Sequence, residues 1–285
     1  MNTIIKKERL SEQVLRYRIR SPKIAAKRKA GQFIILRADE DGERIPLTIA
    51  NANPSEGWIE IIFQIAGHGT KDLAALNEGS KVPDIAGPLG RPTHIAKYGR
   101  CICIGGGVGV APLFPIVKAL KESDNDVTVV IGARSEKLII LEEDMKLFSN
   151  HLHIATDDGS RGTHGFVSDV FNTLWDKGER YDFAVVIGPP VMMKVTSTLT
   201  VKQGIKTFVS LNPIMIDGTG MCGGCRVTVF GETKFGCVDG PEFDASGIDW
   251  DEMIRRLGAY RDFEHNYTHT HQCKILEQET PRSKK

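Results

Sequence analysis

Three of the six cysteines in this chain fall within one short stretch whose spacing suits a metal centre. Cys222 and Cys225 are separated by two glycines, and Cys237 follows after a segment with the pattern of a strand, a turn and a second strand. Glycine lets the backbone wrap closely around a bound group, and thiolates are the usual ligands of iron-sulfur clusters. The stretch therefore predicts an iron-sulfur cluster loop.

The fourth ligand of such a cluster is not a cysteine in this sequence. Plant-type [2Fe-2S] loops follow the spacing C-x4-C-x2-C with a distant fourth cysteine. Asp217 stands five positions before Cys222, where the first cysteine of that spacing would be. A carboxylate at this position would complete the ligand set.

Two other interpretations of these cysteines stay open. A C-x2-C pair with a third cysteine is also part of the pattern of a structural zinc site, which normally has four Cys or His ligands. His265, His269 and His271 are the nearest candidates to complete it, and they lie far along a polar C-terminal segment. The thiols could also be unliganded. The glycines favour a cluster, because a zinc knuckle does not need them.

The composition limits the class of protein. A chain of 285 residues is long enough for two domains and an added module. Its net charge of +1 gives no electrostatic reason to expect a nucleic acid or an anionic membrane as partner. No apolar run reaches the roughly 18 to 20 residues of a membrane span, and the polar first residues lack the apolar core of a signal peptide. We therefore expect a cytoplasmic protein.

The elements that must position this loop begin with a β-rich region, residues 1–97. Short segments with β-branched and aromatic residues alternate with turn signals such as Asp41-Gly42 and Ser55-Glu56-Gly57. Regular spacing of this kind predicts an antiparallel barrel. The predicted strands lie within 3–11, 14–22, 31–39, 44–52 and 58–66.

Two stretches of the barrel have the residue types of a phosphate site. In the strand 44–48, Arg44 and Thr48 occupy alternate positions and could face the same way, which suits a pyrophosphate. In the stretch 67–70, glycines lead into a short helix whose first amides and Thr70 hydroxyl could hold a phosphate oxygen. A surface arginine and an ordinary capped helix would give the same patterns. Neither stretch is decisive alone.

The hydrophobic pattern changes after Gly99 to alternating strands and helices. An apolar strand at 101–106 continues through a glycine-rich turn into a helix with Pro112 in its first turn. This arrangement brings a pyrophosphate against a helix N-terminus. Four more buried strands with helices between them predict a five-stranded parallel, doubly wound sheet over residues 98–212.

Further loops follow these strands at their carboxyl ends, where ligands bind in such sheets. They lie at 132–135, 157–159 and 188–190, and they indicate a nucleotide site. Arg134 could meet a 2′-phosphate, whereas Asp157 and Asp158 would repel one and could bond free ribose hydroxyls. Two carboxylates against one arginine favour NAD(H) over NADP(H).

A barrel with R-I-P-L-T and G-x-G-T, followed by a sheet that opens with G-G-G-V-G-V-A-P, resembles the ferredoxin-NADP reductase superfamily. With the cysteine loop added, the chain is similar to the electron-transfer subunits related to that of dihydroorotate dehydrogenase. It is most similar to the small subunits of NADH-dependent reduced ferredoxin:NADP oxidoreductases, which are electron-bifurcating transhydrogenases. The most specific part is LNPIMIDGTGMCGGCRV with the later FGCVDGPEFD. Asp217 favours the bifurcating type, because the dihydroorotate subunits are expected to use four cysteines.

The resemblance implies FAD in the barrel, NAD(H) on the parallel sheet and one [2Fe-2S] cluster in a small C-terminal module, residues 213–285. It implies no general acid or base. The barrel residues assigned to cofactor binding are Arg44, Pro46, Leu47, Thr48, Phe63, Gln64, Gly67, Gly69 and Thr70. Those of the sheet are Gly106, Gly107, Gly109, Pro112, Arg134, Asp157, Asp158, Gly188 and Pro189. The cluster ligands would be Asp217, Cys222, Cys225 and Cys237.

The implied function is exchange of hydride with NAD(H) and of single electrons with a larger partner subunit, in a heterodimer or higher assembly. That partner would hold flavin and [4Fe-4S] clusters, oxidise NADPH, and send one electron to ferredoxin and one through this chain to NAD+. Two alternatives remain: the electron-transfer subunit of a dihydroorotate dehydrogenase or sulfide-type reductase, and a nucleotide-binding protein with a structural zinc knuckle. We expect a short helix near 250–260, and beyond it a subunit contact or a disordered segment with Cys273 as an unliganded thiol.

Overall fold

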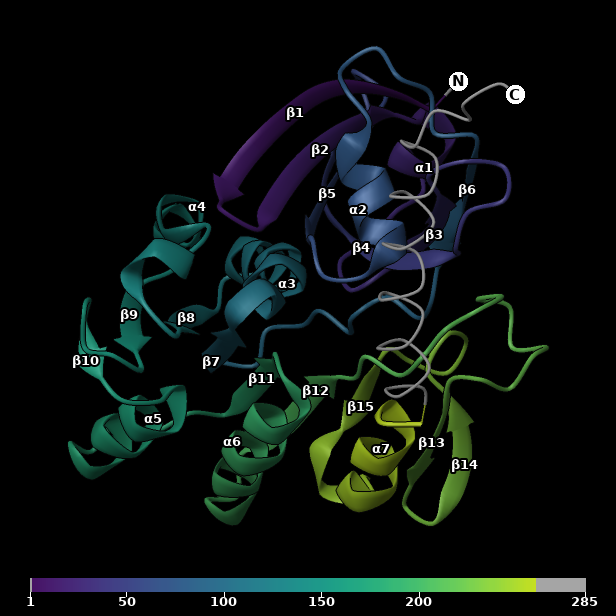
Figure 1. Cartoon of the computed structure of the whole chain (residues 1–285). Coiled ribbons are helices and arrows are strands. Elements are labelled where there is room, and N and C mark those ends of the chain that lie inside the picture. Colours follow the sequence, from purple (N-terminus) through teal and green to yellow (C-terminus); the bar gives the residue numbers. More distant parts are fainter. Residues whose placement is uncertain (1, 260–285) are drawn as a thin grey trace, which may run out of the picture.

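The computed structural model describes residues 2–259 as a barrel, a mostly parallel sheet and a small C-terminal module (Figure 1). The expected helix near 250–260 is α7, Trp250–Leu257. Cys273 and the three C-terminal histidines considered as zinc ligands lie outside the described residues. No helix of the described part is both long and apolar enough to cross a membrane.

The N-terminal region is a six-stranded antiparallel sheet with the order β1-β2-β5-β4-β3-β6. A bridge between Thr3 and Lys81 brings its two edges together. The five segments that the sequence predicts are all strands. The sixth strand, β6, is not among the predicted segments; it includes Gly87-Pro88-Leu89 and pairs with β3. The strands are β1 Thr3–Ser11, β2 Val14–Arg20, β3 Phe33–Arg37, β4 Ile45–Asn53, β5 Trp58–Gln64 and β6 Asp84–Leu89.

Two short helices accompany the barrel, α1 Pro22–Ala25 and α2 His68–Ala75. The C-terminal end of α2 is fixed from inside the barrel. The hydroxyl of the fully buried Tyr17 donates to the Leu73 and Leu76 carbonyls at 3.0 and 2.9 Å, and the Lys7 ammonium also bonds this end. These donors satisfy carbonyls that a helix end leaves without partners. Burial raises the pKa of Tyr17 to about 12, so the phenol remains a donor.

The second sheet has seven strands in the order β10-β9-β8-β7-β11-β12-β15. The predicted five-stranded parallel sheet is confirmed. It forms the centre of this sheet and consists of β9, β8, β7, β11 and β12. Two short edge strands were not expected: β10 continues the parallel order, and β15 pairs antiparallel with β12. The strands are β7 Arg100–Gly106, β8 Asp126–Ala133, β9 His151–Thr156, β10 Thr163–His164, β11 Phe183–Ile187, β12 Lys206–Ser210 and β15 Glu242–Asp244.

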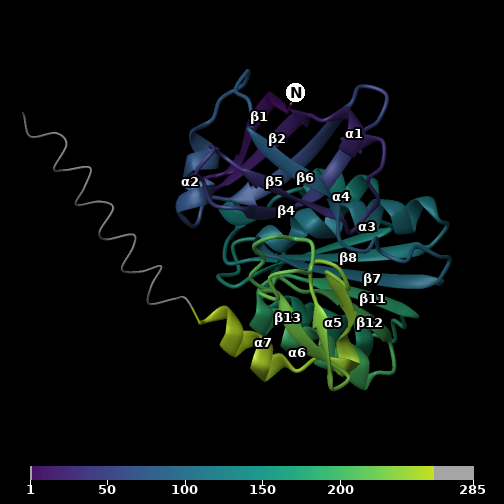
Figure 2. The same ribbon diagram turned by 90° about the vertical axis from the view of Figure 1, so that its right-hand side faces the viewer.

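Helices cover both faces of this sheet, so successive residues of β7 enter different cores. Cys101 and Cys103 pack with α3 and α4, whereas Ile102 and Ile104 pack with α5 and α6. This is the alternation of a parallel strand buried on both faces. Figure 2 shows α3 and α4 between the barrel and the sheet, with α5 and α6 on the other side. The helices are α3 Val110–Glu122, α4 Glu142–Leu147, α5 Val167–Asp176 and α6 Pro190–Lys202.

The C-terminal module contacts both larger parts. It contains the cysteine loop, the hairpin β13 Arg226–Val229 and β14 Glu232–Phe235, then β15 and α7. Cys225 and Cys237 pack against Phe33 and Ile35 of barrel strand β3. The module therefore joins the sheet through β15 and the barrel through the cysteine loop.

Candidate functional site

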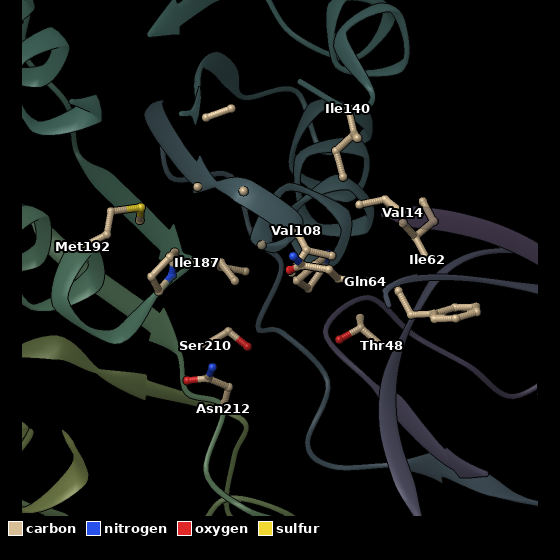
Figure 3. A pocket seen from close by; sticks show the side chains of 18 of the residues that line it. Val14, Thr48, Ile62, Gln64, Val108, Ile140, Ile187, Met192, Ser210 and Asn212 are labelled. Atoms are coloured by element: carbon tan, nitrogen blue, oxygen red, sulfur yellow. The ribbon is translucent and has the colours of Figure 1, made fainter. Parts of the chain in front are cut away.

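A cavity of about 830 Å³ lies where the barrel, the parallel sheet and the start of the C-terminal module meet (Figure 3). Its walls include β4 and β5 of the barrel and the residues at the carboxyl ends of five parallel strands. That edge is where ligands bind in open parallel sheets. The predicted site residues that line it are Pro46, Leu47, Thr48, Phe63, Gln64, Thr70, Gly106, Gly107, Gly109, Pro112, Arg134, Asp157, Gly188 and Pro189.

Four predicted residues do not line this cavity: Arg44, Gly67, Gly69 and Asp158. Arg44 is exposed and lies before the first residue of β4. The expectation that Arg44 and Thr48 face the same way along one strand therefore does not apply. The Gly69 amide donates to the Glu43 carboxylate at 3.1 Å.

Asp158 is engaged within its own turn. Its carboxylate accepts from the Ser160 amide at 3.0 Å and from the Ser160 hydroxyl at 2.6 Å. The Ser160 hydroxyl and amide hold the pKa of Asp158 below its ordinary value. Of the two carboxylates that favoured NAD(H), only Asp157 therefore faces the cavity.

The glycine turn after β7 fits a pyrophosphate because it is pressed against a neighbouring strand end. A Cβ on Gly109 would lie 2.7 Å from both the Cα of Gly188 and the carbonyl oxygen of Ile187. Gly107 has a φ of +55°, and a Cβ there would meet nothing within 4 Å. The turn thus brings the backbone at the start of α3 to the cavity wall without a side chain in between.

The barrel side of the cavity fits a planar ring with a polar edge. Thr48 and Gln64 are directed into the same space as Ser210 and Asn212 from the opposite wall (Figure 3). Most of the remaining lining is apolar, with Val108 and Ile187 nearby. A largely apolar cavity with a few convergent polar groups is typical of cofactor sites. These residues fit the flavin ring and the nicotinamide that the family implies.

Ser210, Asn212, Met192 and Phe166 line the cavity but were not predicted. Ser210 and Asn212 make no side-chain hydrogen bond within the described residues. Both lie at the carboxyl end of β12, so the rule that selected Gly188 after β11 could have selected them too. Phe166 precedes α5 and carried no comparable signal.

In the cysteine loop, Cys225 and Cys237 are buried with their sulfurs 3.2 Å apart, whereas Cys222 is exposed. Two thiolates on one tetrahedral metal with bonds of about 2.3 Å would be about 3.8 Å apart. The pair thus needs only a small separation to share one metal atom. Burial and the Cys225 thiol raise the pKa of Cys237 to about 12, so metal binding must displace a proton.

Asp217 lies beside the third cysteine. Its carboxylate accepts from the amides of Thr219 and Cys222, both at 2.6 Å, and the Thr219 bond contributes most to lowering the pKa of Asp217. Within residues 2–259, no three His, Cys, Asp or Glu side chains are grouped to hold a single metal ion. Two separate pairs, Asp217 with Cys222 and Cys225 with Cys237, fit a two-iron cluster better than one zinc ion.

Two family models match the chain. Residues 212–249 match the iron-sulfur cluster binding domain of dihydroorotate dehydrogenase B. Residues 103–198 match an oxidoreductase NAD-binding domain. The first match covers the four predicted cluster ligands, and the second covers the glycine turn.

Curated relatives cover most of the chain. A Thermotoga maritima protein named dihydroorotate dehydrogenase B (NAD(+)), electron transfer subunit homolog is 45% identical over 264 residues, which are 93% of each chain. The dihydroorotate dehydrogenase B (NAD(+)) electron transfer subunit of Shouchella clausii is 36% identical over 228 residues, covering 76% of this chain and 85% of the relative.

Solved structures show the same fold. A chain of the NADH-dependent reduced ferredoxin-NADP oxidoreductase, from a study of flavin-based electron bifurcation, superimposes with a TM-score of 0.91 at 42% identity. The match covers 96% of this chain and 98% of that chain. The ferredoxin reductase of carbazole 1,9a-dioxygenase reaches a TM-score of 0.61 at 22% identity over 71% of this chain and 65% of that chain, a likeness of fold alone.

Proposed function

The chain belongs to the family of electron-transfer subunits related to that of dihydroorotate dehydrogenase B, and from this premise we propose that it serves flavin-based electron bifurcation. It is a subunit of an NAD(H)-dependent oxidoreductase with sites for FAD, an iron-sulfur cluster and NAD(H). In the proposed reaction, NADPH oxidation by a larger subunit is coupled to reduction of ferredoxin and, through this chain, of NAD+.

The observation that carries the proposal is the short connection between the cavity and the cysteine loop. Phe33 and Met215 line the cavity, and the same two side chains pack against Cys225 and Cys237. When bound, the flavin exchanges a hydride with NAD(H) and single electrons with the iron-sulfur cluster. The chain holds the two sites on either side of one apolar layer and keeps water out of it.

The polar groups of the cavity have a positioning role in this proposal. Thr48 and Gln64 hold the flavin edge from the barrel, while the backbone of Gly106, Gly107 and Gly109 approaches the pyrophosphate of NAD(H). Hydride transfer needs the two rings close and aligned more than it needs an acid or base. We therefore assign no proton-transfer residue.

The surface around the cysteine loop supports docking of the larger subunit there. Met221 is 89% exposed, and Ile216 and Val238 are also large exposed apolar side chains. Met221 directly precedes Cys222, Ile216 directly precedes Asp217, and Val238 directly follows Cys237. Exposed apolar residues beside a redox centre suit a protein interface. We propose that the partner, with its own flavin and [4Fe-4S] clusters, covers this surface.

The test is to purify the complex without oxygen and assay it with NADPH, ferredoxin and NAD+. The proposal requires FAD and about two irons in this chain, as in a [2Fe-2S] cluster, in addition to the iron of the partner's clusters. It also requires ferredoxin reduction by the complex that depends on NAD+. A colourless zinc protein without flavin would exclude it. The names of the relatives favour one alternative, a dihydroorotate dehydrogenase subunit. Oxidation of dihydroorotate by the co-purified partner, without NADPH-dependent ferredoxin reduction, would establish that alternative.

A further inference from the structure

The C-terminal helix α7 packs against the strand that follows the cysteine loop. Strand β13 begins at Arg226, directly after Cys225. Trp250 and Met253 of α7 are buried in one core with Val227 of that strand. Figure 1 shows α7 beside β13 in the C-terminal module. The helix is therefore fixed next to the predicted cluster ligands.

The start of α7 is anchored, and this sets the position of its last turn. The Asp249 carboxylate caps the helix by accepting from the Glu252 amide at 2.9 Å. The Asp249 amide donates to the Thr228 carbonyl of β13 at 3.0 Å. The last turn contains two adjacent arginines, of which Arg255 is exposed and Arg256 is partly buried. The two side chains therefore have different surroundings.

The Arg256 guanidinium contacts the segment between two predicted cluster ligands. Its Nη2 donates to the carbonyl oxygen of Gly224 at 3.3 Å. Gly224 lies between Cys222 and Cys225, and its own amide donates to the Cys222 sulfur at 3.4 Å. The residue that Arg256 holds is thus the one that bonds a ligand sulfur.

A second guanidinium lies beside the same pair of glycines. A Cβ on Gly223 would be 3.3 Å from Nη1 of Arg226. Within residues 2–259, neither Arg226 nor Arg256 forms an ion pair. By contrast, Arg91 pairs with Asp239 of the same module at 3.2 Å. Arg226 and Arg256 therefore add positive charge to the cysteine loop.

We propose that Arg256 is a positioning residue that holds the loop between Cys222 and Cys225 and raises the reduction potential of the cluster. This rests on the proposed function, in which the cluster takes up one electron at a time. Three thiolates and a carboxylate give a bound cluster a net negative charge, which each added electron increases. A fixed positive charge beside the ligands favours the reduced form. Solvent and salt screen the partly buried Arg256 less than the exposed Arg255.

The test is a redox titration of the full chain loaded with FAD and cluster, followed by the electron paramagnetic resonance of the reduced cluster. Arg256→Gln removes the charge, and Arg256→Lys retains it. In Arg256→Gln the equilibrium constant for one-electron reduction should fall by about three- to tenfold, a shift of about 30 to 60 mV downward at 59 mV per decade. Arg256→Lys should stay within about twofold of the natural protein.

Arg255 provides the matched control, because it is the adjacent residue, has the same charge and does not bond the loop. Arg255→Gln should change the equilibrium constant by less than about twofold. A shift as large as that of Arg256→Gln would overturn the proposal, since the contact with Gly224 would then not matter. An unchanged potential in Arg256→Gln, at natural iron content, would overturn it as well.

Iron analysis covers the case in which a variant does not hold its cluster. Unfolding temperatures establish that the variants fold. Loss of iron in Arg256→Gln but not in Arg256→Lys would support a hold on the loop that depends on the charge. Equal loss in both variants would show that only the shape of the guanidinium matters, and the proposal would fail.

The proposed function is judged by a separate measurement. An unchanged potential in Arg256→Gln leaves it standing, provided that the natural complex reduces ferredoxin from NADPH in the presence of NAD+. If the natural complex with its cluster does not catalyse that reaction, the proposed function itself fails.

Discussion

The nucleotide cavity and the cysteine loop differ in how far the polypeptide alone completes them. The cavity is walled by packed strand ends and by a glycine turn pressed against Gly188. In the loop, only Cys225 and Cys237 are buried together, while Cys222 is exposed and Asp217 bonds backbone amides. A site built from sheet packing exists before its ligand binds, whereas a metal site often takes its final form only with the metal. The two sites should therefore respond independently to mutation.

The largest effect is expected from removing a buried ligand. Cys225→Ser should abolish the cluster, because Cys225 is 1% exposed and no other thiol of the described residues lies beside Cys237. Iron content and visible absorption measure this directly. When NADH reduces ferricyanide, the electrons pass to ferricyanide directly from the flavin. The rate of this reaction should stay within about twofold of that of the natural protein, since the cavity is unaffected. Cys101→Ala, in the sheet, is the control that should keep the cluster.

Glu242 lies where the C-terminal module meets the barrel and the parallel sheet. It belongs to β15, and its carboxyl accepts a hydrogen bond from the Thr93 hydroxyl, in the segment between barrel and sheet. Burial raises the pKa of Glu242 from 4.5 to about 7. Its contribution to stability is full below pH 4.5 and is lost as the pH rises through 7, because the unfolded chain releases the proton first.

Glu242→Gln should remove this pH dependence. Between pH 5 and 8 the free energy of unfolding of the natural protein should fall by up to about 3 kcal/mol relative to the variant. Urea unfolding of both proteins at several pH values measures the difference, and other titrating groups cancel in it. Parallel stability curves would show that Glu242 does not titrate as described.

The glycine turn offers a test of the preformed cavity. Gly109→Ala would place a Cβ against the backbone at Gly188, and overpacking of this kind costs about 1–3 kcal/mol. NADH affinity should fall by about 10- to 100-fold. Gly107→Ala is the matched comparison: it adds left-handed strain but no clash, so its effect should be smaller. Titration of the FAD-loaded chain with NADH measures both, and equal losses would show that the close approach to Gly188 is not what matters.

The fold was predictable wherever an element is specified by its own pattern. The first five barrel strands and the five central parallel strands each contain enough β-branched and apolar residues to be recognised locally. The strands β6 and β15 are short, and β6 contains Gly and Pro. They form because strands that are distant in the sequence pair with them. Ser210 of β12, for example, pairs with Glu242 of β15. Sequence periodicity contains no information about such partners.

The same distinction applies to the site. Gly109 and Gly188 were predictable, because a rule connects strand ends to ligand binding. Asp158 was chosen by that rule too, and only the structure shows that Ser160 occupies its carboxylate. Phe166 was missed because an aromatic before a helix is ordinarily interpreted as core. Which polar group faces the ligand depends on side-chain geometry that residue order does not give.

The smallest expected effect concerns the residue that separates this loop from a four-cysteine one. Asp217→Cys should preserve the iron content and lower the reduction potential of the cluster by on the order of tens of millivolts, because a thiolate donates more electron density than a carboxylate. A redox titration followed by absorption measures the shift. Asp239 is the control: its carboxylate accepts from the Phe235 amide at 2.9 Å in the same module, and Asp239→Glu, which keeps the charge, should leave the potential unchanged. An unchanged potential and spectrum in Asp217→Cys would remove Asp217 from the ligand set. Asp217 would then serve to hold the loop in place for Cys222, through the hydrogen bonds that its carboxylate accepts from two backbone amides.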